Sequence, residues 1–160
     1  MRPSYETDQD RGNERIVRDI LMEYHNCAFG KLTNAHYVLD YCGYEASTTK
    51  IIGWFEIKCR NMSWGQYDTI MLSLGKWREG LQYFFSTGVP FYFVVSTYDG
   101  VFQYKQSMID VKHGRIICEY GGRTEKTRDA GDVEPVMMIP IDLFEKISSE
   151  NCFTRKANNV

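Results

Sequence analysis

The sequence lacks the features that mark several classes of protein. Its five cysteines are odd in number and scattered, and none forms a Cys-x-x-Cys pair, so neither a disulfide framework nor a zinc site is expected. No apolar run approaches the roughly 18 residues of a membrane span. The polar start, residues 1–12, does not resemble a secretory signal. We therefore expect a cytoplasmic protein with reduced thiols and no membrane partner.

A surplus of positive charge is also absent. The net charge is −2 and the isoelectric point is near 5.9, so bulk charge gives no support to a nucleic-acid partner. Such a partner would need a local basic patch. The 160 residues, 43% hydrophobic and 25% charged, are typical of one domain, 1–160, that is large enough to bury a core.

Hydrophobic spacing in the first half predicts one helix and a strand hairpin. Ile16, Val17, Ile20 and Leu21 recur at helical spacing. Asp10 or Asn13 is the expected helix cap. The expected elements are a loose arm over 1–9, a helix over 10–24 that ends near Gly30, a strand over 34–42, a turn over 43–50 and a strand over 51–60. The two strands should pair in antiparallel fashion.

The second half predicts a long helix and further strands. The helix has an apolar stripe of Ile70, Leu74, Trp77, Leu81, Phe84 and Phe85. Gly75 and Gly80 each weaken it by roughly 1 kcal/mol relative to Ala, and close packing would explain them. The expected elements are a loop over 61–66, the helix over 68–85, strands over 91–96 and 101–104 joined at Asp99-Gly100, a hairpin of 108–111 and 116–120 joined at His113-Gly114, a mobile loop over 121–135, a strand over 136–139, a helix over 142–147 and a tail over 148–160. The whole is an α/β fold with a mixed sheet flanked by helices.

The strand over 51–60 carries a carboxylate and an ammonium group two residues apart. Glu56 and Lys58 share one face with Trp54, whereas Phe55 and Ile57 face the other way, because side chains alternate along a strand. Burying either charge without a partner would cost several kcal/mol, on the order-of-magnitude scale for ions. A surface salt bridge is the simple interpretation of this pair taken alone.

Two further acids give the pair another meaning. Glu14 lies at the border of the apolar stripe of the first helix, and Asp40 lies in the strand expected beside Glu56. Taken singly, Glu14 suits the first turn of a helix and Asp40 suits the end of a strand. Taken together, they place three acids and one lysine where they can meet.

This order resembles the PD-(D/E)XK nuclease superfamily. The motif stands as Leu39-Asp40, then Glu56-Ile57-Lys58, with Leu39 where the name of the motif has Pro. The helix around Glu14 looks like that of Holliday-junction resolvases, and the phrase over 53–60 with the following helix looks like small phage-encoded members. The resemblance covers roughly residues 10–105. It implies a restriction-endonuclease-like αβββαβ core, here with additional C-terminal strands.

The resemblance also implies a metal site and a reaction. Asp40 and Glu56 would hold Mg²⁺, with Mn²⁺ as a substitute, because hard cations take oxygen ligands. The family places a third ligand at the backbone carbonyl of Ile57, and Glu14 would hold a second ion or reach the first through water. Lys58 would orient or help deprotonate the attacking water and would offset charge on the phosphate.

The expected substrate is DNA, although RNA is also compatible. The resemblance to phage-encoded members is compatible with a protein that acts in a phage-infected bacterial cell. A homodimer would suit the cutting of two strands. The candidate phosphate contacts are Arg60, Lys76, Arg123, Lys126 and Arg128. Lys76 lies off the apolar stripe and is expected to be solvated, and Trp64 and Tyr67 are expected to pack rather than to stack on bases. Two alternatives stay open: a protein of this fold that binds nucleic acid without cutting it, and an α/β interaction domain in which Glu56 and Lys58 form a surface pair.

Overall fold

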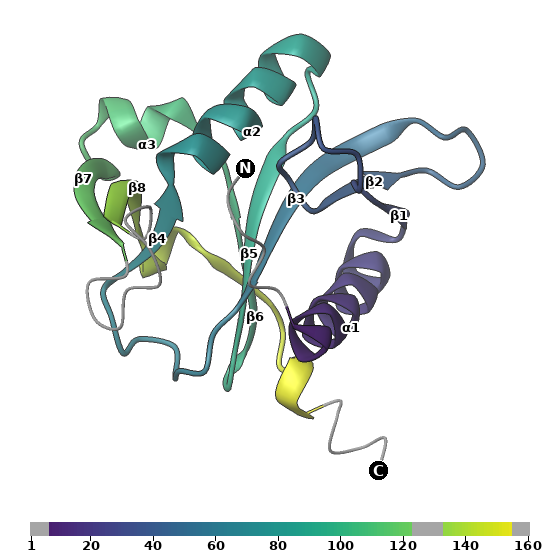
Figure 1. Cartoon of the computed structure of the whole chain (residues 1–160), viewed down its shortest axis with the longest axis horizontal. Coiled ribbons are helices and arrows are strands. Elements are labelled where there is room, and N and C mark those ends of the chain that lie inside the picture. The colour runs from purple at the N-terminus through teal and green to yellow at the C-terminus, as the bar shows by residue number, and fades with distance from the viewer. Residues whose placement is uncertain (1–6, 123–132, 155–160) are drawn as a thin grey trace.

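A six-stranded mixed sheet organises the protein. The computed structural model describes residues 7–122 and 133–154. The sheet has the order β1-β2-β3-β5-β6-β9, and only the β3–β5 pair is parallel among the described strand pairs. Its strands are β1 (Ala28–Lys31), β2 (Tyr41–Tyr44), β3 (Ile51–Cys59), β5 (Phe91–Thr97), β6 (Gly100–Lys105) and β9 (Glu145–Ser148). The strand predicted over 51–60 therefore lies in the middle of the sheet (Figure 1).

A small sheet and two helices complete the layers. The small sheet has the order β4-β8-β7, and its strands are β4 (Thr69–Ser73), β8 (Val133–Pro140) and β7 (Ile117–Gly122). The helices α1 (Asp8–His25) and α2 (Leu74–Thr87) lie on opposite sides of β3 and β5 (Figure 1). The succession α1, β1–β3, α2, β5 contains the predicted αβββαβ core, with β4 inserted before α2 and more strands at the C-terminal end.

The side chains of β3 alternate between two faces, as predicted, and the structure shows a hydrophobic core on each face. Phe55 and Ile57 pack with α1, whereas Trp54 packs with α2 and the small sheet. Glu56 and Lys58 share the parity of Trp54, so they project toward α2. Glu56 and Lys58 are the two charged residues of β3, and both lie on the α2 side of the sheet.

The first helix differs from its prediction at both ends. Thr7, not Asp10 or Asn13, is the N-cap, and Asp10 completes a capping box by accepting from the Thr7 N–H at 2.9 Å. The helix ends at His25, because Asn26 adopts a left-handed conformation with φ of 50°. The helix was thus predicted too far toward Gly30, and β1 was missed.

The predicted antiparallel hairpin forms, but its first strand lies later in the sequence than predicted. The predicted strand over 34–42 starts only at Tyr41 and continues to Tyr44, where it pairs with β3. Asp40 comes just before it and donates its N–H to the Phe55 carbonyl at 3.1 Å. Asp40 is therefore fixed against β3 although it lies outside the strand.

The helix predicted over 68–85 is a strand followed by a helix. Residues 69–73 form β4, which pairs with β8, and the helix begins after Ser73, whose Oγ accepts from the Lys76 N–H at 3.2 Å. Phe84 and Phe85, expected in the core, are 44% and 74% exposed. A Cβ at Gly80 would lie 2.2 Å from the Phe91 ring, so close packing does explain this glycine.

The later elements bring three further corrections. The predicted strand over 108–111 is the helix α3 (Met108–Lys112), which is capped by Ser107, so the expected hairpin does not form. The helix expected over 142–147 is a short 3-10 turn, η2 (Ile141–Leu143), followed by β9. The ends of the loop predicted over 121–135 belong to β7 and β8, and residues 123–132 lie outside the described part.

The predicted tail over 148–160 is anchored in its first residues. Ser148 belongs to β9, and Asn151 and Cys152 are fully buried. The Asn151 amide donates to the Tyr98 carbonyl at 3.0 Å. The predicted strands over 91–96 and 136–139 are confirmed. The hairpin predicted at Asp99-Gly100 forms, but its turn is Tyr98 and Asp99, because Gly100 already pairs with Thr97. In the described ranges no helix is long and apolar enough to cross a membrane.

Candidate active site

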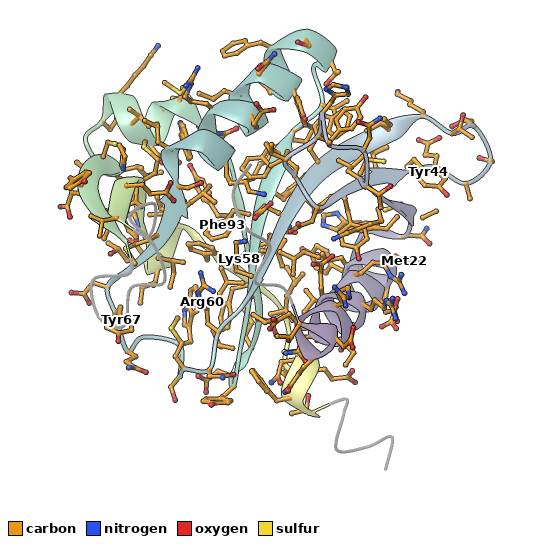
Figure 2. The ribbon with its side chains drawn as sticks, in the orientation of Figure 1. Met22, Tyr44, Lys58, Arg60, Tyr67 and Phe93 are labelled. Carbon is orange, nitrogen blue, oxygen red and sulfur yellow. The ribbon has the colours of Figure 1, made fainter. Side chains whose placement is uncertain are left out.

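A buried carboxylate held by two lysines forms the centre of the site. The Glu56 side chain is 0% exposed. The Nζ of Lys58 lies 2.8 Å from Glu56 Oε1, and the Nζ of Lys76 lies 2.9 Å from Glu56 Oε2. Lys58 comes from the same face of β3, and Lys76 comes from the first turn of α2. Figure 2 shows Lys58 on β3 beneath that helix.

The position of Lys76 corrects the prediction that it is solvated. Ser73 caps the helix through the Lys76 N–H and so fixes where this side chain leaves the backbone. Its Nζ donates to the Val38 carbonyl as well as to Glu56. Lys76 therefore ties α2 to both β3 and the loop before β2, and it belongs to the site itself. The signal that could have placed it is Ser73, three residues earlier, at a helix start.

Asp40 is fixed on β3 beside Glu56. Its Oδ2 accepts from the Ile57 N–H at 2.8 Å, in addition to the bond that its own N–H makes to Phe55. Its side chain is 19% exposed. Asp40 and Glu56 thus reach the same end of β3 from neighbouring parts of the hairpin, as the sequence predicted.

Glu14 reaches the site through a lysine that the sequence did not predict. The Nζ of Lys31, at the end of β1, forms an ion pair with Glu14 and lies 3.9 Å from Asp40 Oδ1. The same Nζ lies 4.8 Å from the centre of the Tyr41 ring. Lys31 was missed because β1 has four residues, too few for an alternating pattern to show.

The charges of this cluster influence one another. Burial alone would raise the pKa of Glu56, but Lys58 and Lys76 outweigh burial and hold that pKa below its ordinary value. The same Glu56 charge raises the pKa of Lys58 against the effect of burial. Burial and the neighbouring Glu56 raise the pKa of Asp40 to about 7, although Lys58, the Ile57 N–H and Lys76 oppose them. The two carboxylates are therefore close enough to repel.

The donor atoms suit a hard cation, although lysines now neutralise them. In the described ranges, no group of three or more Asp, Glu, His or Cys side chains is arranged to hold a metal ion. The pair formed by Asp40 and Glu56 nevertheless offers oxygen donors of the kind that Mg²⁺ takes. Glu56 Oε1 is buried, and among the described residues Lys58 is the ion-pair partner that contacts it, at 2.8 Å. A buried carboxylate beside a second carboxylate fits a divalent cation.

The other predicted phosphate contacts have mixed outcomes. Arg60 follows β3, donates its backbone N–H to the Ser96 carbonyl at 2.9 Å and lines a pocket together with residues of β4 and β8. Arg123, Lys126 and Arg128 lie outside the described residues. Trp64 stacks on Phe102 with ring centres 3.8 Å apart, so packing is confirmed for this tryptophan.

Comparisons with known proteins give one family. The sequence matches a family described as "Phage putative PDDEXK endonuclease" over residues 1–147. No curated protein matches the chain. Among solved structures, it is similar to the 1.6 Å structure of Archaeoglobus fulgidus Hjc, a Holliday junction resolvase from an archaeal hyperthermophile, with 17% identity, a TM-score of 0.48, and coverage of 81% of this chain and 95% of that chain. The family match spans every residue of the site described above.

Proposed function

The chain belongs to the phage PDDEXK endonuclease family, and from this premise we propose that it cuts DNA with the help of Mg²⁺, for which Mn²⁺ can substitute. The observation that carries the proposal is the placement of Asp40 on the Ile57 N–H at 2.8 Å, beside a fully buried Glu56 that is paired with two lysines. A surface salt bridge, the simple interpretation of Glu56 and Lys58, does not account for this burial.

In the proposed reaction the carboxylates of Asp40 and Glu56, with the backbone carbonyl of Ile57, would hold the cation. The bound cation would supply an activated water and would neutralise charge that develops on the phosphate. The Ile57 N–H fixes the rotamer of Asp40 and leaves its Oδ1, 3.9 Å from Lys31, as the oxygen with the weaker partner. The protein thereby holds its ligands in place before the substrate arrives.

Lys58 is the proposed cation that faces the phosphate and the attacking water. Its side chain is 37% exposed although its Nζ contacts a fully buried carboxylate, so it reaches from the interior toward the substrate side. Glu56 keeps it protonated, because it raises the pKa of the Lys58 ammonium. A charged Lys58 stabilises negative charge on the phosphate and donates hydrogen bonds to it.

Lys76 and Glu14 act as positioning residues in this proposal. Lys76 shares the charge of Glu56 from the α2 side, so that Lys58 need not neutralise the carboxylate alone. Glu14 pairs with Lys31 and so sets the ammonium that lies near Asp40. Neither assignment requires a second metal ion.

A cleavage assay tests the proposal. Supercoiled, linear and branched DNA are incubated with the protein in Mg²⁺, in Mn²⁺ or in EDTA. The Lys58→Ala variant is compared with Lys112→Ala, which removes an exposed lysine of α3. We expect metal-dependent products that fall at least about a hundredfold in Lys58→Ala, the scale of one electrostatic catalytic group, and that persist in Lys112→Ala. Equal activity of the two variants would overturn the role of Lys58.

A protein that binds nucleic acid without cutting it is the second candidate. The observation in its favour is that three lysines, Lys31, Lys58 and Lys76, lie against the carboxylates of the site. Salt-sensitive binding with no product in either metal would select this candidate over the nuclease.

A further inference from the structure

A pocket of about 290 Å³ is lined by Arg60, which follows Lys58 of the candidate site by two residues. We call it the Arg60 pocket. Its described lining is mostly apolar and includes Arg60, Met62, Tyr67, Ile70, Met71 and Met138. Ile70 is buried, whereas Tyr67 and Met71 are 58% and 43% exposed. The pocket therefore has an apolar base and an accessible aromatic and thioether rim.

The position of the pocket connects it to the scissile phosphate. Arg60 comes two residues after Lys58, directly after the end of β3, and its N–H still pairs with the Ser96 carbonyl of β5. The extended pairing therefore continues to Arg60, so its Cα lies about 7 Å beyond that of Lys58 on the same face. Figure 2 shows Lys58 on β3 and Arg60 just beyond the end of that strand, with Tyr67 in the loop before β4. The two cations are close enough that the guanidinium charge opposes the raised pKa of Lys58. A phosphate at Lys58 would place its neighbouring nucleotide over this pocket.

Resting on the proposed nuclease function, we propose that the Arg60 pocket binds one unstacked nucleobase next to the phosphate held at Lys58. A nucleobase has flat, weakly polar faces, which the Tyr67 ring and the thioether of Met71 can contact. Its edges and the adjoining phosphate carry acceptors that a guanidinium can reach. A groove lined only by basic residues would bind the sugar-phosphate backbone of DNA alone. The described lining of this pocket instead combines one cation, Arg60, with apolar side chains.

The proposal has a consequence for the choice of substrate. A base inside a duplex must leave its stack before it can enter the pocket, and leaving the stack costs least when the base is already unpaired. The protein should therefore favour DNA with an unpaired base at the cut site, as in branched, mismatched or single-stranded DNA, over a perfect duplex.

Binding measurements in EDTA test the pocket without requiring cutting. Short DNA strands carry 5-iodouracil at one position in turn, and photochemical cross-links to the full-length protein are mapped by mass spectrometry. We expect one position to cross-link within residues 67–71 of the pocket lining. The same position replaced by an abasic site should bind about tenfold more weakly, the scale of one base stacked on an aromatic ring. Matched RNA strands show whether the sugar matters.

Variants at Tyr67 distinguish stacking from a general effect on the surface. Tyr67→Ala should weaken binding of the unpaired-base strand about tenfold and should no longer distinguish it from the abasic strand. Tyr67→Phe, which loses only the hydroxyl contact with Gln66, should stay within about twofold. Tyr120→Ala removes a tyrosine that is 78% exposed outside the pocket and should leave binding unchanged.

The outcomes separate this proposal from the nuclease proposal. Cross-links that map away from the pocket, or a Tyr67→Ala variant that binds like the wild type, would overturn the pocket while DNA cleavage persists. Base-dependent binding without cleavage in Mg²⁺ or Mn²⁺ would support the pocket and would overturn the nuclease. Absence of any DNA or RNA binding would overturn both.

Discussion

Lys76 shows how a single residue can make a buried carboxylate tolerable. Glu56 is 0% exposed, and an ionised carboxylate there would be costly without partners. Lys58 and Lys76 approach its two oxygens from different elements, so each lysine stabilises a different part of the same charge. Removing one lysine leaves one carboxylate oxygen of Glu56 buried without its positively charged partner.

Lys76→Met should therefore destabilise the fold by about 1–3 kcal/mol near pH 8, the scale of a buried polar group left without its partner. The loss should shrink as the pH falls, because the variant lacks one of the charges that hold the pKa of Glu56 low and so takes up a proton more readily. Urea unfolding across pH 5–8 measures this, with the exposed Lys112→Met as the control. A loss that does not change with pH would show that Glu56 stays ionised without Lys76.

His25 gives a second prediction at the residue scale. Its ring lies against Phe55 and Tyr92, with one nitrogen 2.9 Å from the Gln103 amide oxygen. Burial lowers its pKa, although Gln103 and the charge of Glu145 oppose the shift. The folded protein consequently binds fewer protons at this position than the unfolded chain does. The stability that neutral His25 contributes is present above its unfolded pKa, near 6.5, and is lost as the pH falls through its folded pKa.

His25→Gln should flatten the fall in unfolding free energy below about pH 6.5. Glutamine keeps a polar side chain near Gln103 and cannot become charged. The measurement is the difference in urea midpoints between variant and wild type at pH 7.5 and pH 5.5. His113→Gln, at an exposed turn, serves as the control. Parallel pH profiles for the wild type and His25→Gln would contradict the role of this ring.

At the scale of elements, the position of α2 against the sheet depends on one glycine, Gly80. Gly80 packs so closely on β5 that a Cβ would lie 2.2 Å from a ring carbon of Phe91, whereas a Cβ at Gly75 would meet only Ser73 Oγ at 4.0 Å. The two glycines lie in the same helix, so they separate the close-packing effect from helix propensity. The helix also carries Lys76, so the position of α2 on the sheet determines where the Lys76 ammonium meets Glu56.

Gly80→Ala should destabilise the fold by roughly 1–3 kcal/mol, the range for overpacking a core, and should lower cleavage because α2 moves away from β5. Gly75→Ala should instead stabilise the fold by up to about 1 kcal/mol, the gain in helix propensity. Thermal unfolding and the cleavage assay measure the two effects. A stabilising Gly80→Ala would show that Phe91 yields easily to the added methyl group.

The sequence predicted long elements better than short ones, for a physical reason. The strand over 51–60 is long enough for its alternation to show, and it determined the correct faces of Phe55 and Ile57. Residues 69–73 were read as helix because Ile70, Leu74 and Trp77 also fall at helical spacing. What makes them a strand is pairing with β8, some 65 residues later, which no local pattern contains. The strands β1 and β9 were missed because four residues are too few for an alternating pattern to show.

At the scale of the molecule, the site is assembled from five parts of the chain. Asp40, Glu56 and Lys58 could be predicted because their hairpin is local in sequence. Lys31 and the inward position of Lys76 could not, because they depend on how α1, β1 and α2 settle on the sheet. A cation that bridges the carboxylates would therefore strengthen contacts between elements that are distant in sequence, and its binding should stabilise the whole fold.

Mg²⁺ or Mn²⁺ at a hundred times its dissociation constant should add about 2.7 kcal/mol to the folded state, or roughly 5–10 °C in melting temperature for a chain of this size. Asp40→Asn keeps an oxygen for the Ile57 N–H but removes the charge that repels Glu56. Without added metal this variant should be at least as stable as the wild type, and in Mg²⁺ its melting temperature should not rise. Asp142→Asn, whose side chain is 68% exposed, should respond to Mg²⁺ like the wild type. An equal metal-induced rise in Asp40→Asn would remove Asp40 from the cation site, because a general effect of divalent ions acts on both variants alike.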